Sequence, residues 1–261
     1  MSHPKFDISD RVVLVTGGTS GLGRAIAIGM AEAGARVFAG SRDAGRIDAA
    51  REQLKAHAST NDAIALDVAD PASVEAAVTA VVSGAGRLDI LVNAAGVTHR
   101  ANAEDMALED WERVLRINLT GTFLASQAAA RQMISQGEGG AIVSIASLAS
   151  YVGLSFVSAY CASKAAVQEL TRVLAVEWAQ HDIRVNAIAP GVFPTPLNRP
   201  LIEGTPRGEW FVKHTPMGRF GEAPELVAAA IYLACPGASY VTGITLPVDG
   251  GFLALGAPAN P

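Results

Sequence analysis

The sequence is poor in the residues that build disulfide frameworks and metal centres. Only Cys161 and Cys235 are cysteines among its 261 residues, which is too few for a disulfide framework. Neither has the C-x-x-C or Cys/His spacing of a zinc site, and the five histidines are scattered. We therefore predict no metal site, and we expect a thiol-reducing compartment, the cytoplasm.

A surplus of basic residues and long apolar runs are also missing. The sequence has 20 Lys and Arg against 25 Asp and Glu, whereas a nucleic-acid surface needs clustered positive charge. Its start lacks the apolar core of a signal peptide, and no apolar run approaches the roughly 18 residues of a membrane span. We expect neither a nucleic-acid nor a membrane partner. Half of the residues are hydrophobic, so the chain can bury a sizeable core.

Short β-rich runs alternate with longer, alanine-rich stretches along the whole chain. Several runs are apolar nearly throughout, which is typical of strands covered on both faces. Helices are predicted at Gly23–Ala33, after Asp70-Pro71 and at Ala159–Gln180. This alternation predicts an α/β fold, with one domain over residues 1–261 built on a doubly wound parallel sheet, a Rossmann fold. The predicted strands are Val12–Val15, Val37–Ala39, Ala63–Leu66, Ile90–Val92, Ala141–Ile145, Arg184–Ile188 and Thr245–Val248.

The segment after the sixth predicted strand, from Pro190 to about Gly221, departs from this rhythm. A loop of this length in a compact domain is usually functional, so we predict a substrate loop or lid over residues 190–221. A surface insertion without function is the alternative. No long helix is expected there, because prolines recur at Pro190, Pro194, Pro196, Pro200, Pro206 and Pro216.

A glycine-rich turn joins the first strand to the first helix in the run Thr16-Gly-Gly-Thr-Ser-Gly-Leu-Gly23. In this context we expect Gly17 to take a positive φ and Gly21 to let the backbone approach a pyrophosphate. Gly23 would let the helix pack closely on the strand, and the helix N-terminus would offer free N–H groups to the anion. The spacing differs from the commoner G-x-G-x-x-G, and a purely structural turn is the alternative.

Polar residues follow two further strands of the predicted sheet. Asp67 ends the third strand and Asn93-Ala-Ala-Gly96 follows the fourth. Ligands of open α/β sheets bind at the carboxyl ends of the strands, so both segments are candidates for contact with a ligand. Asp67 fits equally well as a cap at the entry of the next helix.

Three residues further along form a candidate catalytic group. Tyr160 and Lys164 are i and i+4 on a predicted helix, so their side chains share a face, and Ser147 follows the neighbouring strand. An ammonium beside a phenol favours phenolate and lowers the tyrosine pKa from its usual value of about 10. The serine hydroxyl could donate a hydrogen bond to a developing alkoxide or carbonyl oxygen. The alternative is an exposed helix face that happens to carry Tyr and Lys.

Together these motifs resemble the short-chain dehydrogenase/reductase family, in its order and spacing, from about Val12 to Gly251. The resemblance implies an oxidoreductase that passes a hydride between nicotinamide C4 and a substrate carbon bearing an alcohol or ketone oxygen. The matching segments are Thr16-Gly17, Gly21-Leu22-Gly23, Asn93-Ala-Ala-Gly96, Asn118, Ser147, Tyr160-Cys-Ala-Ser-Lys164 and Pro190-Gly191 with Thr195.

The resemblance also implies a role for each catalytic residue. Tyr160 would exchange the proton with the substrate oxygen, and Ser147 would orient that oxygen. Lys164 would lower the tyrosine pKa and hold the nicotinamide ribose, while Asn118 would support a proton-relay water. Ala94 departs from the pattern, because the family commonly has a second Asn there, and we expect only a local loss of hydrogen bonds.

The end of the second strand bears on the choice of dinucleotide. NAD-preferring relatives usually carry an acidic residue where Ser41 stands, which accepts from the ribose hydroxyls and repels a 2′-phosphate. Arg42 can pair with that phosphate, although Ser20 stands where many NADP-preferring relatives have a second basic residue. We predict NADP(H), with NAD(H) and a merely solvated Arg42 as the alternative. Phe193 and Thr195 match positions that hold the carboxamide, and the expected cofactor-binding set is Gly17, Thr19, Ser20, Gly21, Leu22, Gly23, Ser41, Arg42, Asp67, Val68, Asn93, Ala94, Gly96, Tyr160, Lys164, Pro190, Phe193 and Thr195.

The substrate class follows from segments that resemble one branch of the family, which contains gluconate 5-dehydrogenase and related sugar-acid dehydrogenases. This implies a small alcohol or ketone substrate, namely a sugar acid, a polyol or a similar hydroxy compound. A 3-oxoacyl-thioester reductase of the same family is the second hypothesis. A non-catalytic dinucleotide-binding protein is the third, and the presence of Tyr160 and Lys164 disfavours it. The segments are Gly96-Val-Thr-His-Arg100, Ile183–Pro190, Gly218–Gly221 and Val248–Leu253.

Two further expectations concern Arg100 and the quaternary structure. Arg100 lies four residues past Gly96, where its guanidinium could clamp a substrate carboxylate; the alternative is a solvated loop arginine or one paired with Glu104. The resemblance implies a homotetramer, built on the alanine-rich helices around Thr122–Gln136 and Ser163–Gln180.

Overall fold

Seven parallel strands form one sheet in the computed structural model, which describes residues 4–196 and 198–256. The strands lie in the order β3-β2-β1-β4-β5-β6-β7, so the chain reverses its direction across the sheet between β1 and β4. Ligands of open α/β sheets bind at this reversal, beyond the carboxyl ends of the strands. The strands are β1 Val12–Thr16, β2 Arg36–Ser41, β3 Asp62–Ala65, β4 Ile90–Asn93, β5 Gly140–Ile145, β6 Ile183–Pro190 and β7 Thr245–Val248.

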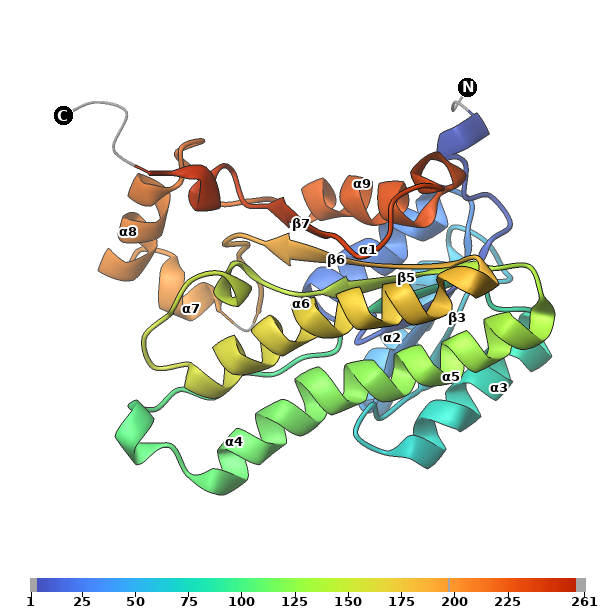
Figure 1. Ribbon diagram of the computed structural model, residues 1–261, viewed down its shortest axis with the longest axis horizontal. Helices are drawn as coiled ribbons and strands as arrows, with labels where there is room; N and C mark the ends of the chain where they lie inside the picture. The colour runs from blue at the N-terminus through green and yellow to red at the C-terminus, as the bar shows by residue number, and fades with distance from the viewer. Residues whose placement is uncertain (1–3, 197, 257–261) are drawn as a thin grey trace.

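Helices cover both faces of this sheet (Figure 1). On one face α1, α2 and α9 bury apolar side chains against the strands, and on the other face α3, α5 and α6 do so. Because the strands are covered on both sides, a central strand such as β1 is buried along its whole length. The helices are α1 Gly21–Glu32, α2 Ala44–Lys55, α3 Pro71–Ala85, α4 Leu108–Leu115, α5 Gly121–Gln136, α6 Ser158–Trp178 and α9 Ala223–Ala234.

Short-range signals set the helix ends that the sequence predicted. The Asp70 carboxylate accepts a hydrogen bond from the Ala72 N–H at 3.0 Å, and Pro71 takes the first position of α3. Gly34 follows α1 with a φ of +88°, the left-handed conformation that ends many helices. The α/β fold, the single doubly wound domain and all seven strands are confirmed.

The segment predicted to be a substrate loop or lid is more ordered than the sequence suggested. Within 190–221 the chain forms two short helices, α7 Arg199–Ile202 and α8 Pro206–His214. The proline pattern excluded a long helix, but Pro206 stands at the first position of α8, where the missing N–H costs nothing. The Thr205 hydroxyl caps this helix by accepting from the Gly208 N–H at 3.1 Å. The described part of this segment contains no long helix, as predicted, but two short stretches of it are helical.

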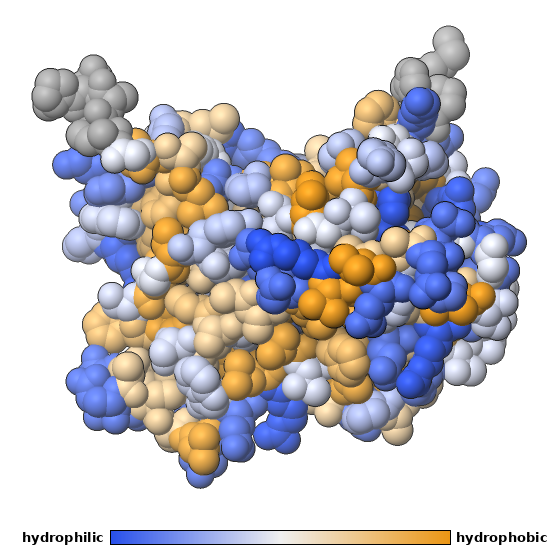
Figure 2. All heavy atoms as spheres, in the orientation of Figure 1, coloured by the Kyte–Doolittle hydropathy of each residue, from blue (hydrophilic) through white to orange (hydrophobic). Residues whose placement is uncertain are grey.

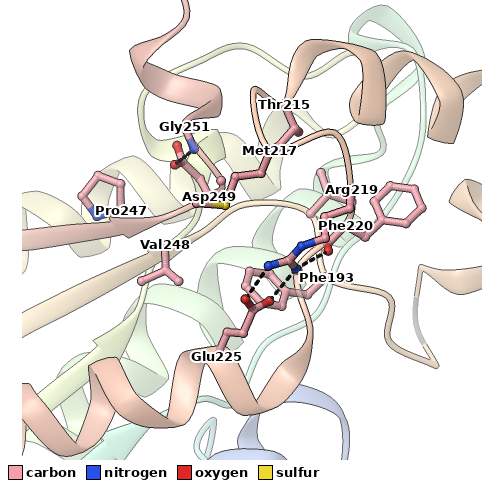
Figure 3. Close-up of a pocket in the computed structure, with 13 residues that line it drawn as sticks. Phe193, Thr215, Met217, Arg219, Phe220, Glu225, Pro247, Val248, Asp249 and Gly251 are labelled. Atoms are coloured by element: carbon pink, nitrogen blue, oxygen red, sulfur yellow. Dashed lines mark hydrogen bonds and ion pairs between the residues drawn. The ribbon is translucent and has the colours of Figure 1, made fainter.

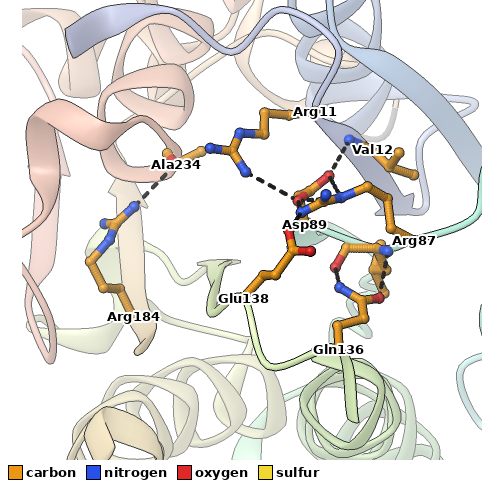
Figure 4. Close-up of polar contacts among 9 residues, drawn as sticks. Arg11, Val12, Arg87, Asp89, Gln136, Glu138, Arg184 and Ala234 are labelled. Atoms are coloured by element: carbon orange, nitrogen blue, oxygen red, sulfur yellow. Dashed lines mark hydrogen bonds and ion pairs between the residues drawn. The ribbon is translucent and has the colours of Figure 1, made fainter. Parts of the chain in front are cut away.

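A network of ion pairs lies at the amino ends of the strands (Figure 4). Asp89, which precedes β4 and is 5% exposed, accepts from the Val12 N–H at 2.8 Å. Its carboxylate also pairs with Arg11 at 3.2 Å and with Arg87 at 2.5 Å. Arg87 reaches Glu138 as well, at 2.7 Å, and hydrogen bonding to Asp89 raises the pKa of Arg87. The network joins β1, β4 and the start of β5 at the edge opposite the predicted site.

Two sequence expectations concern membranes and metals. No helix within the described ranges is long and apolar enough to cross a bilayer. The same ranges contain no group of three or more His, Cys, Asp or Glu side chains placed to hold a metal ion. Cys161 and Cys235 are free thiols.

Candidate active site

The glycine-rich turn connects β1 to α1, and its glycines have two different roles. Gly17 has a φ of +65°, and a Cβ there would meet the Cα of Ala95 at 2.8 Å. A Cβ on Gly23 would lie 2.5 Å from the Gly17 carbonyl oxygen, so both positions require glycine for the packing of the turn itself. Gly23 thus packs against the turn and Ala94 rather than the strand.

Gly21 differs because the space above it is open. Its φ is +53°, and the nearest atoms to a Cβ there belong to Thr195, 3.9 Å away across the mouth of the turn. Ser20 precedes it as the N-cap of α1 without a side-chain capping bond, so the helix N-terminus keeps free N–H groups. This cradle fits a dinucleotide pyrophosphate. Thr19 and Leu22 complete the predicted contacts in the turn.

The end of β4 lies directly against this turn. The Thr16 hydroxyl accepts from the N–H groups of Ala94 and Ala95, at 3.1 and 3.2 Å, which holds the two strand ends together. Asn93 is 3% exposed and donates to the hydroxyls of Ser126 and Ser144. The Asn93 Oδ1 atom is buried and has no hydrogen-bond partner among the residues that the structure describes. A buried acceptor left without a partner is costly unless a ligand or water supplies the donor.

Around the ends of β2 and β3 the structure corrects one expectation. Asp67 does not cap the following helix, a role that belongs to Asp70. Its carboxylate instead accepts from the Ala69 N–H at 2.9 Å and lies 3.8 Å from the Arg42 guanidinium. Arg42 is 58% exposed and Ser41 ends β2 beside it, so a cationic side chain is available where an adenosine ribose would lie. Val68 is buried and packs against Gly121.

Lys164 lies on α6 and points toward the end of β5. Its ammonium donates to the Ile145 carbonyl at 2.6 Å, and the residue is 5% exposed. Burial lowers the pKa of this lysine to about 8, because a charged amine loses hydration in the interior. A Cβ placed on Gly96 would lie 3.7 Å from the ammonium nitrogen, so the loop after β4 closes directly over it.

Tyr160 stands one helical turn before Lys164, on the same face of α6. The ammonium lies 5.7 Å from the centre of the phenol ring. Burial raises the pKa of Tyr160, and hydrogen bonding with Ser147 acts against that increase. The sequence predicted that the pKa of Tyr160 is lowered by Lys164, but desolvation raises it, and the Lys164 ammonium is turned toward the Ile145 carbonyl.

Ser147 and Asn118 complete the predicted catalytic group. Ser147 is buried just past β5, and its Oγ accepts from the Ala149 N–H at 3.1 Å. Asn118 is fully buried within a π-helical segment, Arg116–Thr120, between α4 and α5. Its amide accepts from the Val97 N–H at 2.8 Å and donates to the Val97 carbonyl at 2.9 Å. Asn118 therefore fixes the loop that carries Gly96 over Lys164.

The start of the lid is held by a residue that the sequence did not single out. Asn198 accepts from both the N–H and the hydroxyl of Thr195, at 2.7 and 3.0 Å, and donates to the Phe193 carbonyl at 3.0 Å. This clasp turns Thr195 toward Gly21, next to the end of β6 at Pro190. Asn is common in loops, so its type alone gave no signal.

A pocket of ≈ 310 Å³ lies behind this lid segment, and it is not the predicted site (Figure 3). Phe193 lines it with Asp249 and the ion pair between Arg219 and Glu225, which lie 2.7 Å apart. The pair lowers the pKa of Glu225 to about 2. The Phe193 side chain is 4% exposed and faces this pocket, so any contact of Phe193 with a carboxamide would come from its backbone.

Arg100 is an exposed residue of the loop that follows β4. Its guanidinium carbon lies 5.4 Å from the centre of the Phe156 ring. No ion pair joins it to Glu104 in the part of the chain that the structure describes. Of the alternatives, pairing with Glu104 is therefore not formed, and Arg100 is an exposed loop arginine whose guanidinium packs on an aromatic ring.

One more residue of the site was not predicted. Ser163 is fully buried, accepts from the Asn118 amide at 3.0 Å and donates to the Tyr160 carbonyl at 2.7 Å. It stands inside the run Tyr160-Cys-Ala-Ser-Lys164, where its place before the lysine was the only available signal.

Comparisons with known proteins agree on a single family. A family model described as enoyl-(acyl carrier protein) reductase matches residues 17–253. The chain is 45% identical over 247 residues to D-threitol dehydrogenase of Mycolicibacterium smegmatis, covering 95% of this chain and 94% of that protein. It is 37% identical over 252 residues to gluconate 5-dehydrogenase of Gluconobacter oxydans, covering 96% and 98%. A crystal structure of a gluconate 5-dehydrogenase from Burkholderia cenocepacia, in complex with NADP and tartrate, is 37% identical, covers 96% of this chain and 98% of that one, and has a TM-score of 0.92.

Proposed function

This chain belongs to the short-chain dehydrogenase/reductase family, and from that premise we propose that Tyr160 is its catalytic acid and base in hydride transfer between NADP(H) and a sugar-type alcohol or ketone. One observation carries the proposal. The glycine-rich turn packs on Ala95, and a Cβ on the adjacent Gly96 would reach the Lys164 ammonium at 3.7 Å. That ammonium lies 5.7 Å from the Tyr160 ring, so the dinucleotide cradle and the proton donor share one edge of the sheet.

The chemistry divides between this chain and its cofactor. When bound, the nicotinamide supplies the hydride acceptor or donor. Ser147 donates a hydrogen bond to the substrate oxygen, and Tyr160 exchanges the proton with it. Because burial raises the pKa of Tyr160, the phenol is neutral at neutral pH, which is the form that donates a proton to a carbonyl oxygen during reduction. Lys164 holds the ribose and supplies positive charge near the phenolate that remains.

The residues expected to face the adenosine half of the dinucleotide favour NADP(H). Ser41 brings no carboxylate to repel a 2′-phosphate, and Arg42 is exposed with its nearest acidic partner at a loose 3.8 Å. A phosphate at this place would give Arg42 a charge-assisted partner. The NADP complex of the Burkholderia cenocepacia relative supports the same choice.

The substrate class rests on relatives and on one residue. The relatives are named for threitol and for gluconate, so we place the substrate among polyols and sugar acids. Arg100 leaves the carboxyl end of β4, and its guanidinium packs on Phe156, a residue that precedes Tyr160 by four positions in the sequence. We assign it to substrate binding. The family model described for acyl-carrier-protein substrates keeps a 3-oxoacyl-thioester reductase as the second candidate.

A homotetramer is the assembly that we propose. Apolar side chains gather over α5 and α6 on the face nearest the viewer (Figure 2). Val173 and Val176 of α6 are 46% and 80% exposed, and Phe123 of α5 is 36% exposed. Two-fold pairing of these helices between subunits would bury this surface. Light scattering should return about four times the 26.9 kDa chain mass, and a monomer would contradict the proposal. The two free thiols fit a cytoplasmic protein.

The direct test of this function is a panel of polyols, sugar acids and 3-oxoacyl thioesters, assayed with NADP(H) and with NAD(H). We expect turnover on a polyol or sugar acid, with NADP(H) preferred. The double variant Ser41→Asp with Arg42→Ile should reverse the cofactor preference by about 2–4 kcal/mol, since it removes a charge-assisted pair and adds a repulsion.

The matched control for this swap is Arg46→Ile, which removes a nearby guanidinium that is paired with Asp43 at 3.6 Å. It should leave both dissociation constants within about twofold, because an exposed pair contributes little. A parent enzyme that already binds NAD(H) more tightly would refute the cofactor assignment. Turnover of the acyl thioesters alone would move the chain to the second candidate.

A further inference from the structure

Thr195 lies at the mouth of the dinucleotide cradle, and one neighbouring residue holds it there. Its Cβ and Cγ2 atoms are the nearest atoms to a Cβ built on Gly21, at 3.9 Å. Its N–H and its hydroxyl both reach the Asn198 Oδ1 atom, at 2.7 and 3.0 Å. Its carbonyl accepts in return from the Asn198 N–H at 3.1 Å. Every polar atom of Thr195 is therefore joined to Asn198.

The contacts of Asn198 settle which way its amide points. The Thr195 N–H can only donate, so the atom 2.7 Å from it is the amide oxygen. The amide nitrogen then faces the Phe193 carbonyl at 3.0 Å, which can only accept. Because the Asn198 Oδ1 atom carries no hydrogen, the Thr195 hydroxyl supplies the proton of the 3.0 Å contact between them. The hydroxyl oxygen consequently has only its lone pairs left for a ligand.

The same amide ties Thr195 to a residue that is anchored in the core. Phe193 is 4% exposed, and its ring lines the pocket behind the lid segment (Figure 3). A Cβ on Gly221 would lie 2.4 Å from that ring, so the ring is closely packed. Asn198 binds the carbonyl of this residue and the hydroxyl of Thr195 together. The direction of the hydroxyl is therefore fixed before any ligand arrives.

Capping of a helix does not account for the Asn198 side chain. Asn198 is the N-cap of α7, a position where asparagine usually accepts from the N–H groups of the helix that follows. Its side chain makes no such bond and turns back to Thr195 instead. Thr205, the N-cap of α8, does cap its helix, because its hydroxyl accepts from the Gly208 N–H at 3.1 Å. The Asn198 side chain thus serves Thr195 rather than α7.

We propose that Asn198 is a positioning residue for the cofactor, which makes the Thr195 hydroxyl an acceptor for the carboxamide N–H of the nicotinamide. The phosphate oxygens that the cradle of Gly21 would hold are acceptors themselves, so a hydroxyl without a free proton is no partner for them. The carboxamide, one ribose beyond the pyrophosphate, does carry N–H donors. The inference rests on the proposed function, in which Lys164 holds that ribose. An acceptor fixed at the carboxamide would set the rotation of the nicotinamide ring toward the substrate.

The test compares two cofactor analogues that differ at the carboxamide. Thionicotinamide adenine dinucleotide phosphate keeps the N–H groups, whereas the acetylpyridine analogue has a methyl group in place of the amino group. Isothermal titration of the oxidised analogues, without a second substrate, gives dissociation constants that do not depend on turnover. The parent should bind the thionicotinamide analogue about fivefold to tenfold more tightly, the size of one hydrogen bond.

Variants then assign this preference to Asn198 and Thr195. Asn198→Ala frees the hydroxyl to donate, and Thr195→Val removes the hydroxyl at nearly constant shape, so each should reduce the preference to within about twofold. Asn198→Asp keeps an acceptor for both Thr195 contacts and should retain the preference. The matched lid control is Thr205→Ala, which removes the cap of α8 and should leave the ratio of the two constants unchanged. Thermal unfolding of each variant checks that it folds.

Two results would overturn the inference. Either the parent binds the two analogues equally, or Asn198→Ala weakens both by the same factor and keeps their ratio, as a purely structural role would. Failure of the proposed function is a separate result, because it requires that the parent turns over none of the alcohols in the panel, whatever ratio the analogues give.

Discussion

The two edges of the central sheet are built on opposite principles, although the same strands run from one to the other. At the amino edge Asp89 is 5% exposed and meets Arg11, Arg87 and the Val12 N–H within 3.2 Å. At the carboxyl edge Lys164 is equally buried, but the partner found for its charge is a neutral carbonyl, that of Ile145.

Arg184 and Asn93 extend the same contrast. Arg184 starts from β6 and donates to the carbonyls of Leu233 and Ala234, at 2.6 and 3.0 Å, which caps the end of α9 (Figure 4). Asn93, at the other edge, keeps a buried oxygen for which the described residues supply no donor. The amino edge therefore contributes to stability, while the carboxyl edge carries a buried polar group that stays costly unless a ligand or water pairs with it.

Among the variants that test this contrast, Asp89→Ala should have the largest effect on stability. Removing the carboxylate leaves Arg87 and the Val12 N–H without their acceptor, so the free energy of unfolding should fall by about 3 kcal/mol or more. The turnover number per folded molecule should not change, because the site lies at the far edge. Urea unfolding and a steady-state assay measure the two quantities.

The control for Asp89→Ala is Glu75→Ala, which breaks the exposed pair with Arg131 at 3.3 Å. It should cost under about 1 kcal/mol. If Asp89→Ala costs no more than this control, or if it reduces turnover more than stability explains, the division between the edges is wrong.

The sequence predicted the parts of this contrast that depend on local signals. All seven strands follow from apolar runs, and the Asp70-Pro71 cap and Gly34 follow from backbone preferences that act within one turn. Tyr160, Lys164 and Ser147 were found because their spacing is short or matches a known family. These signals need no knowledge of which distant segments touch.

The rest depended on tertiary contacts. The turn of Thr195 toward Gly21, held by Asn198, brings together two segments whose residue types give no signal in the sequence. The pKa of Tyr160 was predicted in the wrong direction because burial, which the sequence does not give, raises it. The helices of the lid were missed because proline at a first helical position was counted only as a breaker.

A second test of the contrast between the two edges measures how the stability of the protein depends on pH. The pKa of Lys164 is lowered by burial from 10.5 to about 8 in the folded protein. Between these values the unfolded chain binds more protons, so this residue makes stability rise with pH from 8 toward 10.5. Relative to Lys164→Met, the parent should gain on the order of 2 kcal/mol between pH 8 and pH 10.

Denaturant unfolding of the parent and Lys164→Met at several pH values gives this difference. A difference between the two proteins that is flat across this range would show that the ammonium is not desolvated. A stability difference that falls with pH would mean that folding raises the pKa of Lys164 rather than lowering it.

The smallest effect on stability is expected at the glycine-rich turn. Gly21→Ala forces a left-handed residue, which costs about 1–2 kcal/mol, but the nearest atoms of other segments, those of Thr195, lie 3.9 Å from the new methyl group. We expect NADP(H) binding to weaken at least tenfold, because the methyl group enters the pyrophosphate space. Gly23→Ala is the counterpart: its Cβ would clash with the Gly17 carbonyl at 2.5 Å, so it should lose more stability. Equal losses for the two variants would contradict separate roles.

The central claim, that the carboxyl edge does chemistry through Tyr160, is tested most directly by the turnover number of Tyr160→Phe at saturating NADPH and ketone. Phe keeps the ring packing and removes only the exchangeable proton, so turnover should fall by about 10³-fold or more while NADPH binding and the unfolding temperature stay close to the parent. Tyr151→Phe is the matched control. The Tyr151 hydroxyl donates to the Thr245 carbonyl at 3.4 Å and is not part of the proposed catalytic group, so the turnover number of this variant should remain within twofold of the parent. Turnover of Tyr160→Phe within tenfold of the parent would contradict the account.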